Sequence, residues 1–519
     1  MTTIKFQDYR DMVRGCWWGK LVGGTLGAPF EGKRGTVDVD FYVQDDPSGI
    51  PNDDVDMQLV NLRACENYLN KVDAHILAEY WLSYVSISIS EYGSAKNNLK
   101  AHIAPPFSGA VNNPCKNSCG AFIRSELWAC LCAGNPDVAV RYAVEDACVD
   151  HSGEGVYGEI FCAAMQSYAF IEKNIYKLID KALGFIPADS DLTKAVRIAV
   201  DCKKSGKTWK EARYAVLSEV PGSFGISYGN AVEDENDRRL PLSEDFYDAP
   251  SNIALAVIGL IYGENDFGKA ICIATGCGED ADCTAGFVGA VMGIVLGYEK
   301  LPKKWLEPLG DEIVTYCLSS RDDANYPKTN EQLVERILRL TPRFFDGAVD
   351  VLSKGEGYEI KVLEPSELLS VWAIRQKGNP NLYKYPLQLY PDFSSCLERV
   401  GQDAGARYQE LLFDVTVFYP NGITVRENEP FEIKVEFWNR IYEQQQLELK
   451  WYLPDNVAME GGKFVSVFLD QVHGGYNDGI KTFRMKVTKN VNCKVELLLE
   501  VVSVGRYMRS YIPVTLWIN

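Results

Sequence analysis

The stretch GEDADCT, residues Gly278–Thr284, decides how this chain folds, because it places Asp280 and Asp282 directly before a run of small apolar residues. That run is expected to form a helix. Residues i and i+2 inside a helix point about 200° apart at ~3.6 residues per turn, so the two carboxylates can converge only if the segment is still a loop. The helix also presents a stripe of small residues that would let another backbone approach closely: Gly286, Ala290, Gly293 and Gly297.

A second acidic stretch, PNDDVDM at Pro51–Met57, precedes another segment with helical apolar spacing. The positive end of a helix keeps nearby carboxylates ionised. Two such termini facing each other would gather four carboxylates in a small volume, which a hard divalent cation such as Mg²⁺ or Mn²⁺ would stabilise. The alternative is ordinary helix capping by aspartate. Spacing alone leaves Asp56 and Glu279 open as further ligands.

Composition excludes several classes of protein. A net charge of −18 argues against nucleic-acid binding. Four histidines make a zinc site that needs three of them improbable. The apolar stretches fall well short of the ~20 residues of a membrane-spanning helix, and the first residues do not form a secretory signal. Fifteen scattered cysteines indicate a reducing compartment, and we expect a cytoplasmic protein without a membrane partner.

The hydrophobic period changes along the chain. Residues 1–345 favour helices, with N-terminal signals at Asn135-Pro136, Thr208 with Glu211, and Thr329 with Gln332. After residue 405 apolar and polar residues alternate, as in Phe431–Phe437, which is typical of an antiparallel β-sandwich. We therefore expect an all-α domain at 1–345, a connector at 346–404 and an immunoglobulin-like sandwich at 405–519.

Three separated motifs resemble the ADP-ribosylglycohydrolase family. Arg14–Glu31 looks like its glycine-rich first helix ending in a glutamate, Asn52–Met57 is similar to its Thr-Asp-Asp-Thr-x-Met motif, and Gly278–Ala285 is similar to its Gly-Gly-Asp-x-Asp-Thr-x-Ala motif. The resemblance covers roughly residues 8–345. It implies an all-α fold, a dinuclear Mg²⁺ or Mn²⁺ centre, and hydrolysis of the glycosidic bond of an ADP-ribosyl group on a protein or a small conjugate.

The resemblance also implies roles for residues of the two acidic stretches. Cys283 occupies a hydroxyl-ligand position, where a thiol suits Mg²⁺ poorly, so the neighbouring Thr284 is an alternative donor and the second ion is left open. Asn52 replaces a threonine but keeps an oxygen donor. The implied catalytic residues are Glu31, Asp54 and Asp280, and the implied metal ligands are Asn52, Asp53, Asp54, Asp280, Asp282, Cys283 and Thr284.

Two loops resemble the family's substrate-binding segments. Asn117–Arg124 is similar to the loop whose backbone amides hold the diphosphate, and His151–Tyr157 looks like a loop near the ribose. An ordinary helix entry and a capped turn are the alternative interpretations. The implied substrate-binding residues are Ser118, Cys119, Gly120, Phe122, His151, Gly155 and Tyr157.

Two other functions stay open. The chain could be a non-catalytic ADP-ribose-binding homologue, an alternative motivated by Cys283, or a metal-dependent hydrolase of another nucleotide or glycoside. The sandwich suggests no chemistry, and we expect it to dock a partner, to self-associate or to play a structural part.

Overall fold

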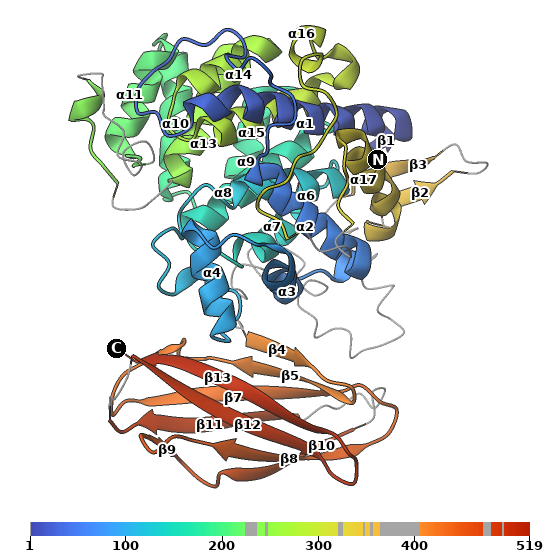
Figure 1. Cartoon of the computed structure of the whole chain (residues 1–519), viewed down its shortest axis with the longest axis vertical. Coiled ribbons are helices and arrows are strands. Elements are labelled where there is room, and N and C mark those ends of the chain that lie inside the picture. The colour runs from blue at the N-terminus through green and yellow to red at the C-terminus, as the bar shows by residue number, and fades with distance from the viewer. Residues whose placement is uncertain are drawn as a thin grey trace. The chain divides into compact units, whose positions relative to one another are not determined.

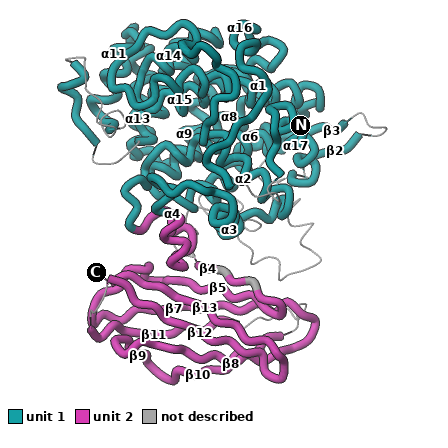
Figure 2. Tube along the Cα trace, in the orientation of Figure 1, with its two compact units in different colours: residues 1–94, 112–368 teal, residues 95–111, 369–519 magenta. Residues whose placement is uncertain are grey.

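The computed structural model describes residues 2–223, 236–243, 248–319, 325–345, 348–352, 357–363, 405–470, 479–489 and 493–518. The chain divides into two compact units (Figure 2): unit 1 contains residues 1–94 and 112–368, and unit 2 contains residues 95–111 and 369–519. Most of the expected connector, at 346–347, 353–356 and 364–404, lies outside the described residues.

The N-terminal part of the chain is helical, as predicted (Figure 1). Short 3₁₀ helices connect several of the α-helices: η1 (Ala28–Phe30), η2 (Leu69–Lys71), η3 (Phe122–Arg124), η4 (Asp237–Arg239) and η5 (Tyr298–Lys300). The α-helices are α1 (Phe6–Gly27), α2 (Asp53–Tyr68), α3 (Ala74–Tyr84), α4 (Ser90–Lys100), α5 (Phe107–Ala110), α6 (Ser125–Leu131), α7 (Pro136–Ala147), α8 (Glu154–Ala169), α9 (Ile175–Leu183), α10 (Asp191–Lys204), α11 (Trp209–Glu219), α13 (Ala249–Gly263), α14 (Phe267–Gly276), α15 (Ala281–Leu296), α16 (Lys303–Leu306) and α17 (Asn330–Phe344).

The two most apolar helices form the centre of unit 1. Every residue of α13 is buried, and α15 is buried from Ala281 to Ile294. Helices that are apolar on all sides belong inside a protein, where α15 packs against α1, α8, α13 and α14. Within the described residues, no helix is both long and apolar enough to cross a membrane.

Helices α1 and α15 pack backbone against backbone. Glycines spaced four apart in α1 meet small residues of α15 in antiparallel order, so that an added Cβ on Gly19 would collide with the carbonyl of Gly289, and one on Gly23 with that of Ala285. The same relation pairs Gly15 with Gly293 and Gly27 with Ala281. Omitting side chains on both helices lets their axes approach more closely than in ordinary helix packing.

The sequence analysis predicted the wrong set of small residues on α15 for the contact with another backbone. Gly293 does face α1, but Gly286 faces the Lys20 side chain, and Gly297 ends the helix with a φ of 81°. Gly289, which the prediction left out, provides a central contact. Small residues occupy more than one stripe of this helix, so composition could not identify the one that meets α1.

The predicted helix starts are confirmed, with one change of role. Thr208 and Glu211 form the full capping box of α11, and Thr329 accepts a hydrogen bond from the Gln332 amide at the start of α17. Asn135 occupies the N-cap position of α7, but its side chain does not cap the helix. It bonds instead to Lys361 and Leu363 of the neighbouring strand region.

Unit 1 also contains a small three-stranded sheet. It has the order β1-β3-β2, in which β1 (Thr3–Lys5) and β2 (Val349–Val351) both pair antiparallel with β3 (Tyr358–Lys361). The described part of the expected connector therefore adds strands to the helical unit.

Unit 2 is the predicted β-sandwich. One sheet has the order β10-β8-β12-β13-β6 and the other the order β4-β5-β7-β11-β9. Inward residues of both sheets form one core, and all pairings are antiparallel except that of β13 with β6. The strands are β4 (Gly405–Gln409), β5 (Phe413–Phe418), β6 (Thr424–Val425), β7 (Pro430–Asn439), β8 (Gln445–Tyr452), β9 (Val457–Met459), β10 (Phe464–Leu469), β11 (Ile480–Val487), β12 (Lys494–Ser503) and β13 (Arg509–Ile518).

Residues 95–111 belong to unit 2, although the sequence analysis assigned them to the helical segment. Ile103 is buried in the sandwich core, and the ring of Phe107 packs edge-on against Tyr419 with centroids 5.9 Å apart. The sandwich is therefore built from two separate parts of the chain.

Replacing Gly19 with alanine should destabilise unit 1, because the new methyl group meets a backbone carbonyl that no rotamer change can move. Overpacking costs ~1–3 kcal/mol, and we expect the upper end despite the helix-propensity gain of about 1 kcal/mol. Denaturant unfolding followed by circular dichroism measures the effect. Gly184→Ala is the matched control, since Gly184 is right-handed and its nearest obstacle is the Lys181 carbonyl at 3.2 Å. Equal stability of the two variants would contradict the close contact.

Candidate functional site

Helices α1 and α15 bring the end of the first motif to the start of the third. Beyond the glycine contact, the segment after α1 and the segment before α15 form a short antiparallel bridge. Gly32 N donates to the Glu279 carbonyl at 2.9 Å, and Glu279 N donates to the Lys33 carbonyl at 2.8 Å. Glu31 and Asp280, which are each adjacent to this bridge in sequence, are therefore held near each other.

The two acidic stretches meet at the N-termini of α2 and α15. The Asn52 amide nitrogen lies 3.4 Å from Asp282 Oδ2, and the Cys283 thiol donates to Asp54 Oδ1 at 3.4 Å. Ligand atoms of Asp54, Asp282 and Cys283 all lie within 4.8 Å of one another. The predicted convergence of residues 230 positions apart in the chain is thus present.

Helix capping does not account for the aspartates. Asn52 caps α2 by accepting a hydrogen bond from the Asp54 amide at 2.7 Å. Asp280 sits just outside α15, at its N-cap position, but its side chain makes no capping bond. Its own amide donates to Asn252 Oδ1 at 3.1 Å, which fixes the loop and lets Asp280 and Asp282 share one side of the helix start.

The carboxylates crowd one another. Burial and the neighbouring Asp54 raise the pKa of Asp53, and burial raises the pKa of Asp280 to about 6. Burial, with Glu31 and Asp280 nearby, raises the pKa of Asp282 well above its ordinary value. Ionised carboxylates this close are unfavourable without a cation.

Glu31 lies at the rim of the cluster. Its side chain as a whole is exposed. Loss of water around its carboxyl group, together with repulsion by Asp280, Asp53 and Asp54, raises the pKa of Glu31 to about 8. An acid of this kind can exchange a proton near neutral pH, which suits general acid–base chemistry.

The donor set fits a hard divalent cation. Asp282 Oδ1 is buried and has no hydrogen-bond partner among the described residues, so it offers a lone pair toward the cluster. Carboxylate oxygens are the ligands that Mg²⁺ and Mn²⁺ prefer. The Thr284 hydroxyl donates to the Ala281 carbonyl of its own helix at 3.2 Å, whereas Cys283 faces Asp54.

The two acidic residues that spacing left open have other partners. Asp56 accepts hydrogen bonds from the amides of Tyr316 and Cys317 at 2.9 and 2.8 Å. Glu279 is buried in an ion pair with Arg34 at 2.8 Å, with Arg213 3.7 Å away. Both residues therefore hold loops in place around the cluster.

The predicted diphosphate loop lies beside the acidic cluster. Burial and the nearby Asp280 carboxylate raise the pKa of the Cys119 thiol well above its ordinary value, and an added Cβ on Gly120 would collide with the Glu91 carboxylate. Phe122 is buried in η3 and packs edge-on against Phe287 of α15. The loop therefore enters a short 3₁₀ turn before α6, and Phe122 anchors it in the core.

The two predicted substrate loops meet through Ser118 and His151. Ser118 Oγ lies 2.8 Å from His151 Nε2, and His151 Nδ1 lies 2.8 Å from Asp150 Oδ1. This order resembles a nucleophilic triad, but all three side chains are fully buried, so the arrangement orients the Ser118 hydroxyl rather than exposing it. Gly155 and Tyr157 lie in the first turn of α8, where a Cβ on Gly155 would collide with the Lys116 carbonyl.

Sequence reasoning missed several residues of the site. The Lys20 ammonium group lies 2.8 Å from Asp54 Oδ2, and the hydroxyls of Tyr92 and Tyr316 donate to Asp53 at 2.9 and 3.2 Å. A signal existed for Lys20, because it is the only charged residue in the glycine-rich stretch Gly15–Gly27 of α1 and a buried lysine requires an acidic partner. The tyrosines come from distant segments without a recognisable motif.

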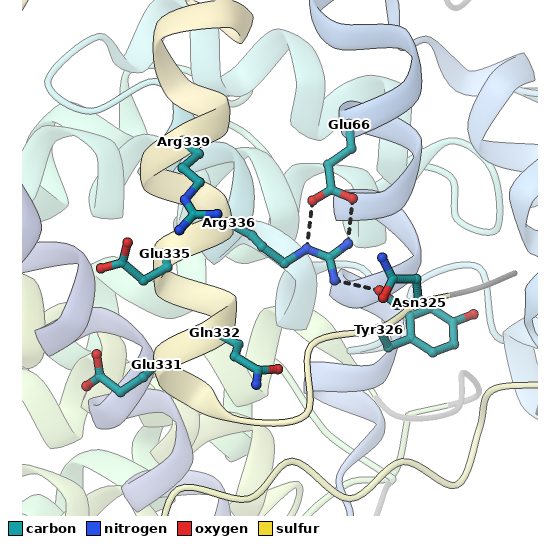
Figure 3. Close-up of a pocket in the computed structure, with 8 residues that line it drawn as sticks. All are labelled: Glu66, Asn325, Tyr326, Glu331, Gln332, Glu335, Arg336 and Arg339. Atoms are coloured by element: carbon teal, nitrogen blue, oxygen red, sulfur yellow. Dashed lines mark hydrogen bonds and ion pairs between the residues drawn. The ribbon is translucent and has the colours of Figure 1, made fainter. Parts of the chain in front are cut away.

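A separate pocket of about 520 Å³ lies elsewhere on unit 1 (Figure 3). Its walls come from α17, α2 and the Asn325-Tyr326 segment. Arg336 forms two hydrogen bonds with the Glu66 carboxylate, at 2.7 and 2.5 Å, so these charges neutralise each other. None of the predicted site residues lines this pocket.

The helical unit contains a centre of buried carboxylates, and sequence comparison identifies the family of this region. The ADP-ribosylglycohydrolase family matches residues 6–343, so the chain belongs to the ADP-ribosylglycohydrolase family. Membership supports a hydrolase of ADP-ribosyl-type linkages, in a family that is typically metal-dependent.

Other comparisons add little. Curated proteins give no match. Among solved structures, the crystal structure of a FixG-related protein from Vibrio parahaemolyticus is similar at 6% identity, covering 21% of this chain and 99% of that one, with a TM-score of 0.17. The GAE domain of GGA2p from Saccharomyces cerevisiae is similar at 13% identity, covering 22% and 98%, also with a TM-score of 0.17. TM-scores this low do not establish a shared fold.

Asp282→Asn should stabilise the chelated protein while weakening its binding of divalent cations. The substitution removes one of several repelling buried carboxylates, so the chelated variant should unfold at a higher temperature than the unaltered protein. Thermal unfolding in the presence of chelator, and then with Mn²⁺, measures both effects. Asp201→Asn is the control, since that side chain is 75% exposed and lies outside the cluster. A loss of stability in the chelated Asp282→Asn protein would refute the idea of charge crowding.

Proposed function

We propose that the chain is a cytoplasmic, metal-dependent hydrolase that cleaves the glycosidic bond of an ADP-ribosyl group on a protein or a small conjugate. The observation that supports this most is the convergence of Asp54, Asp282 and Cys283 within 4.8 Å, at the N-termini of two helices. Family membership supplies the substrate class. The sandwich in this proposal docks the conjugate's protein part or another partner.

The proposed metal ligands are oxygen donors of the two acidic stretches. Asp53, Asp54, Asp280 and Asp282, with Asn52, would hold Mg²⁺ or Mn²⁺. When bound, such an ion supplies Lewis acidity and lowers the pKa of a coordinated water. The aspartates also provide a negative field that stabilises positive charge as it develops at the anomeric carbon.

Glu31 is the proposed acid–base residue. Glu31 as a whole residue is exposed, and its raised pKa of about 8 lets it take or give a proton near neutral pH. Asp54 and Asp280 are the other carboxylates of the proposed catalytic set, and they act by holding charge and water in place.

The proposed substrate-binding residues lie beside this set. The loop at Ser118, Cys119 and Gly120 would receive the diphosphate, and the effect of Asp280 on the pKa of Cys119 supports a position of this loop beside the cluster. His151 would hold the Ser118 hydroxyl in one orientation. Gly155 and Tyr157, in the first turn of α8, would lie near the ribose, with Phe122 supporting the loop from the core.

Purified protein with Mg²⁺ or Mn²⁺ should release free ADP-ribose from at least one member of a panel of ADP-ribosylated proteins and small conjugates. Asp53→Ala and Asp282→Ala should abolish release, and Glu31→Gln should lower kcat at least ~100-fold, the usual minimum for general acid–base catalysis. Chromatography of the released ADP-ribose measures the rate, and Asp201→Asn should match the unaltered protein.

Three outcomes separate the candidate functions. Calorimetric binding of ADP-ribose without turnover on any linkage or metal would assign the chain as a non-catalytic homologue, an alternative favoured by the thiol that Cys283 presents to Asp54. Turnover only of a different nucleotide or glycoside would change the substrate class. If the protein neither binds ADP-ribose nor turns over any substrate, the proposal is refuted.

A further inference from the structure

The acidic cluster contains a positive charge that belongs to the protein. Lys20 Nζ lies 2.8 Å from Asp54 Oδ2 and 3.6 Å from Glu126 Oε2, and it donates to the Ile123 carbonyl at 3.2 Å. The side chains of Lys20 and Asp54 are each about 1% exposed. The ammonium group therefore forms a close ion pair with Asp54, with the Glu126 carboxylate as a second negative neighbour and the Ile123 carbonyl as a hydrogen-bond acceptor.

The surroundings fix Lys20 in this position. Glu126 is held by the amide groups of Gln58 and Gln166, which each donate to it at 2.8 Å. Gly286 makes room for the lysine stem, since an added Cβ there would lie only 3.3 Å from Lys20 Cδ. The neighbouring side chains therefore hold the ammonium group in a fixed, buried position within the site.

Asp54 has a charged partner within the protein. Its Oδ2 forms an ion pair with Lys20, and its Oδ1 accepts the Cys283 thiol at 3.4 Å. Asp282 differs, because the group 3.4 Å from its Oδ2 is the neutral side-chain amide of Asn52, and its buried Oδ1 has no hydrogen-bond partner among the described residues. A lysine of the chain thus offsets the charge of Asp54, and a neutral group is the neighbour of Asp282.

We propose that the Lys20 ammonium replaces one of two divalent cations, so that the centre binds a single Mg²⁺ or Mn²⁺ ion. Asp54 then leaves the set of metal ligands proposed above, and Asp53, Asp280 and Asp282 hold the ion. This inference rests on the proposed metal-dependent function. A second divalent ion at Asp54 would face a fixed positive charge and a thiol, and neither favours a hard cation. Lys20 is a positioning residue in this arrangement.

Titration of the chelated, full-length protein with Mn²⁺ tests the inference. Native mass spectrometry should find one Mn²⁺ per chain at saturation, and electron paramagnetic resonance should show the six-line spectrum of an isolated ion. Lys20→Met removes the charge but keeps the length of the side chain, and it should admit a second ion at least ~10-fold more tightly than the unaltered protein. Two ions in the unaltered protein, or none, would overturn the proposal.

Cys283→Thr is the matched variant, because it restores a hydroxyl and leaves Lys20 in place. It should still bind one ion. A second ion in this variant would show that the thiol, and not the lysine, limits the metal content. Should Lys20→Met fail to fold by circular dichroism, the unaltered protein and Cys283→Thr still decide the question. Should it fold and bind only one ion, the proposal fails.

Release of ADP-ribose, measured on the same samples, keeps the two proposals separate. Turnover with two bound ions would reject the role of Lys20 and retain the hydrolase. One bound ion without turnover on any substrate would retain the role of Lys20 and reject the hydrolase.

Discussion

The backbone contact between α1 and α15 is the constraint on which the site depends. Four small residues of each helix meet in antiparallel order, so the C-terminal end of α1 must lie beside the N-terminal end of α15. The bridge between Lys33 and Glu279 continues this contact past the ends of both helices. A larger side chain at any of these positions would separate the helices and move Glu31 away from Asp280. The glycines of the first motif therefore act on the site at a distance, by setting where its acidic residues lie.

Charge balance then sorts the acidic residues of unit 1 into two groups. Glu279 is paired with Arg34, and Asp146 and Asp150 are both paired with Arg124, so these buried carboxylates support loops and helices. Asp282 has no such partner among the described side chains. Buried charges are tolerated when they are paired, so a carboxylate left without a cation marks the place where a ligand supplies one.

Sequence reasoning succeeded where local chemistry decides the structure. Helix starts follow from capping residues such as Thr208 with Glu211, and the sandwich follows from period-two alternation such as Phe431–Phe437. The meeting of the acidic stretches was expected from the resemblance of their motifs to the family, since spacing alone left ordinary helix capping as the alternative. Long-range choices were not predictable: the register of the α1–α15 contact, the turning of Asn135 toward Lys361, and the inclusion of Ile103 in the sandwich core. Each of these depends on a partner that is distant in sequence, and no local pattern specifies it.

The departure from the family motif at Cys283 lies beside the ion pair of Lys20, because both side chains contact Asp54. A hydroxyl at position 283 is useful where it donates a lone pair to a metal ion, but a thiol is a poor ligand for Mg²⁺ and a weak hydrogen-bond donor. Here the Cys283 thiol donates to Asp54 Oδ1, while Lys20 neutralises Oδ2 of the same carboxylate. Once an ammonium group balances Asp54, a hydroxyl ligand beside it has no ion to hold, and a thiol satisfies the remaining oxygen. Under the proposed single-ion centre, the lysine removes the requirement for a hydroxyl at position 283, because Lys20 and Cys283 together contact both oxygens of Asp54.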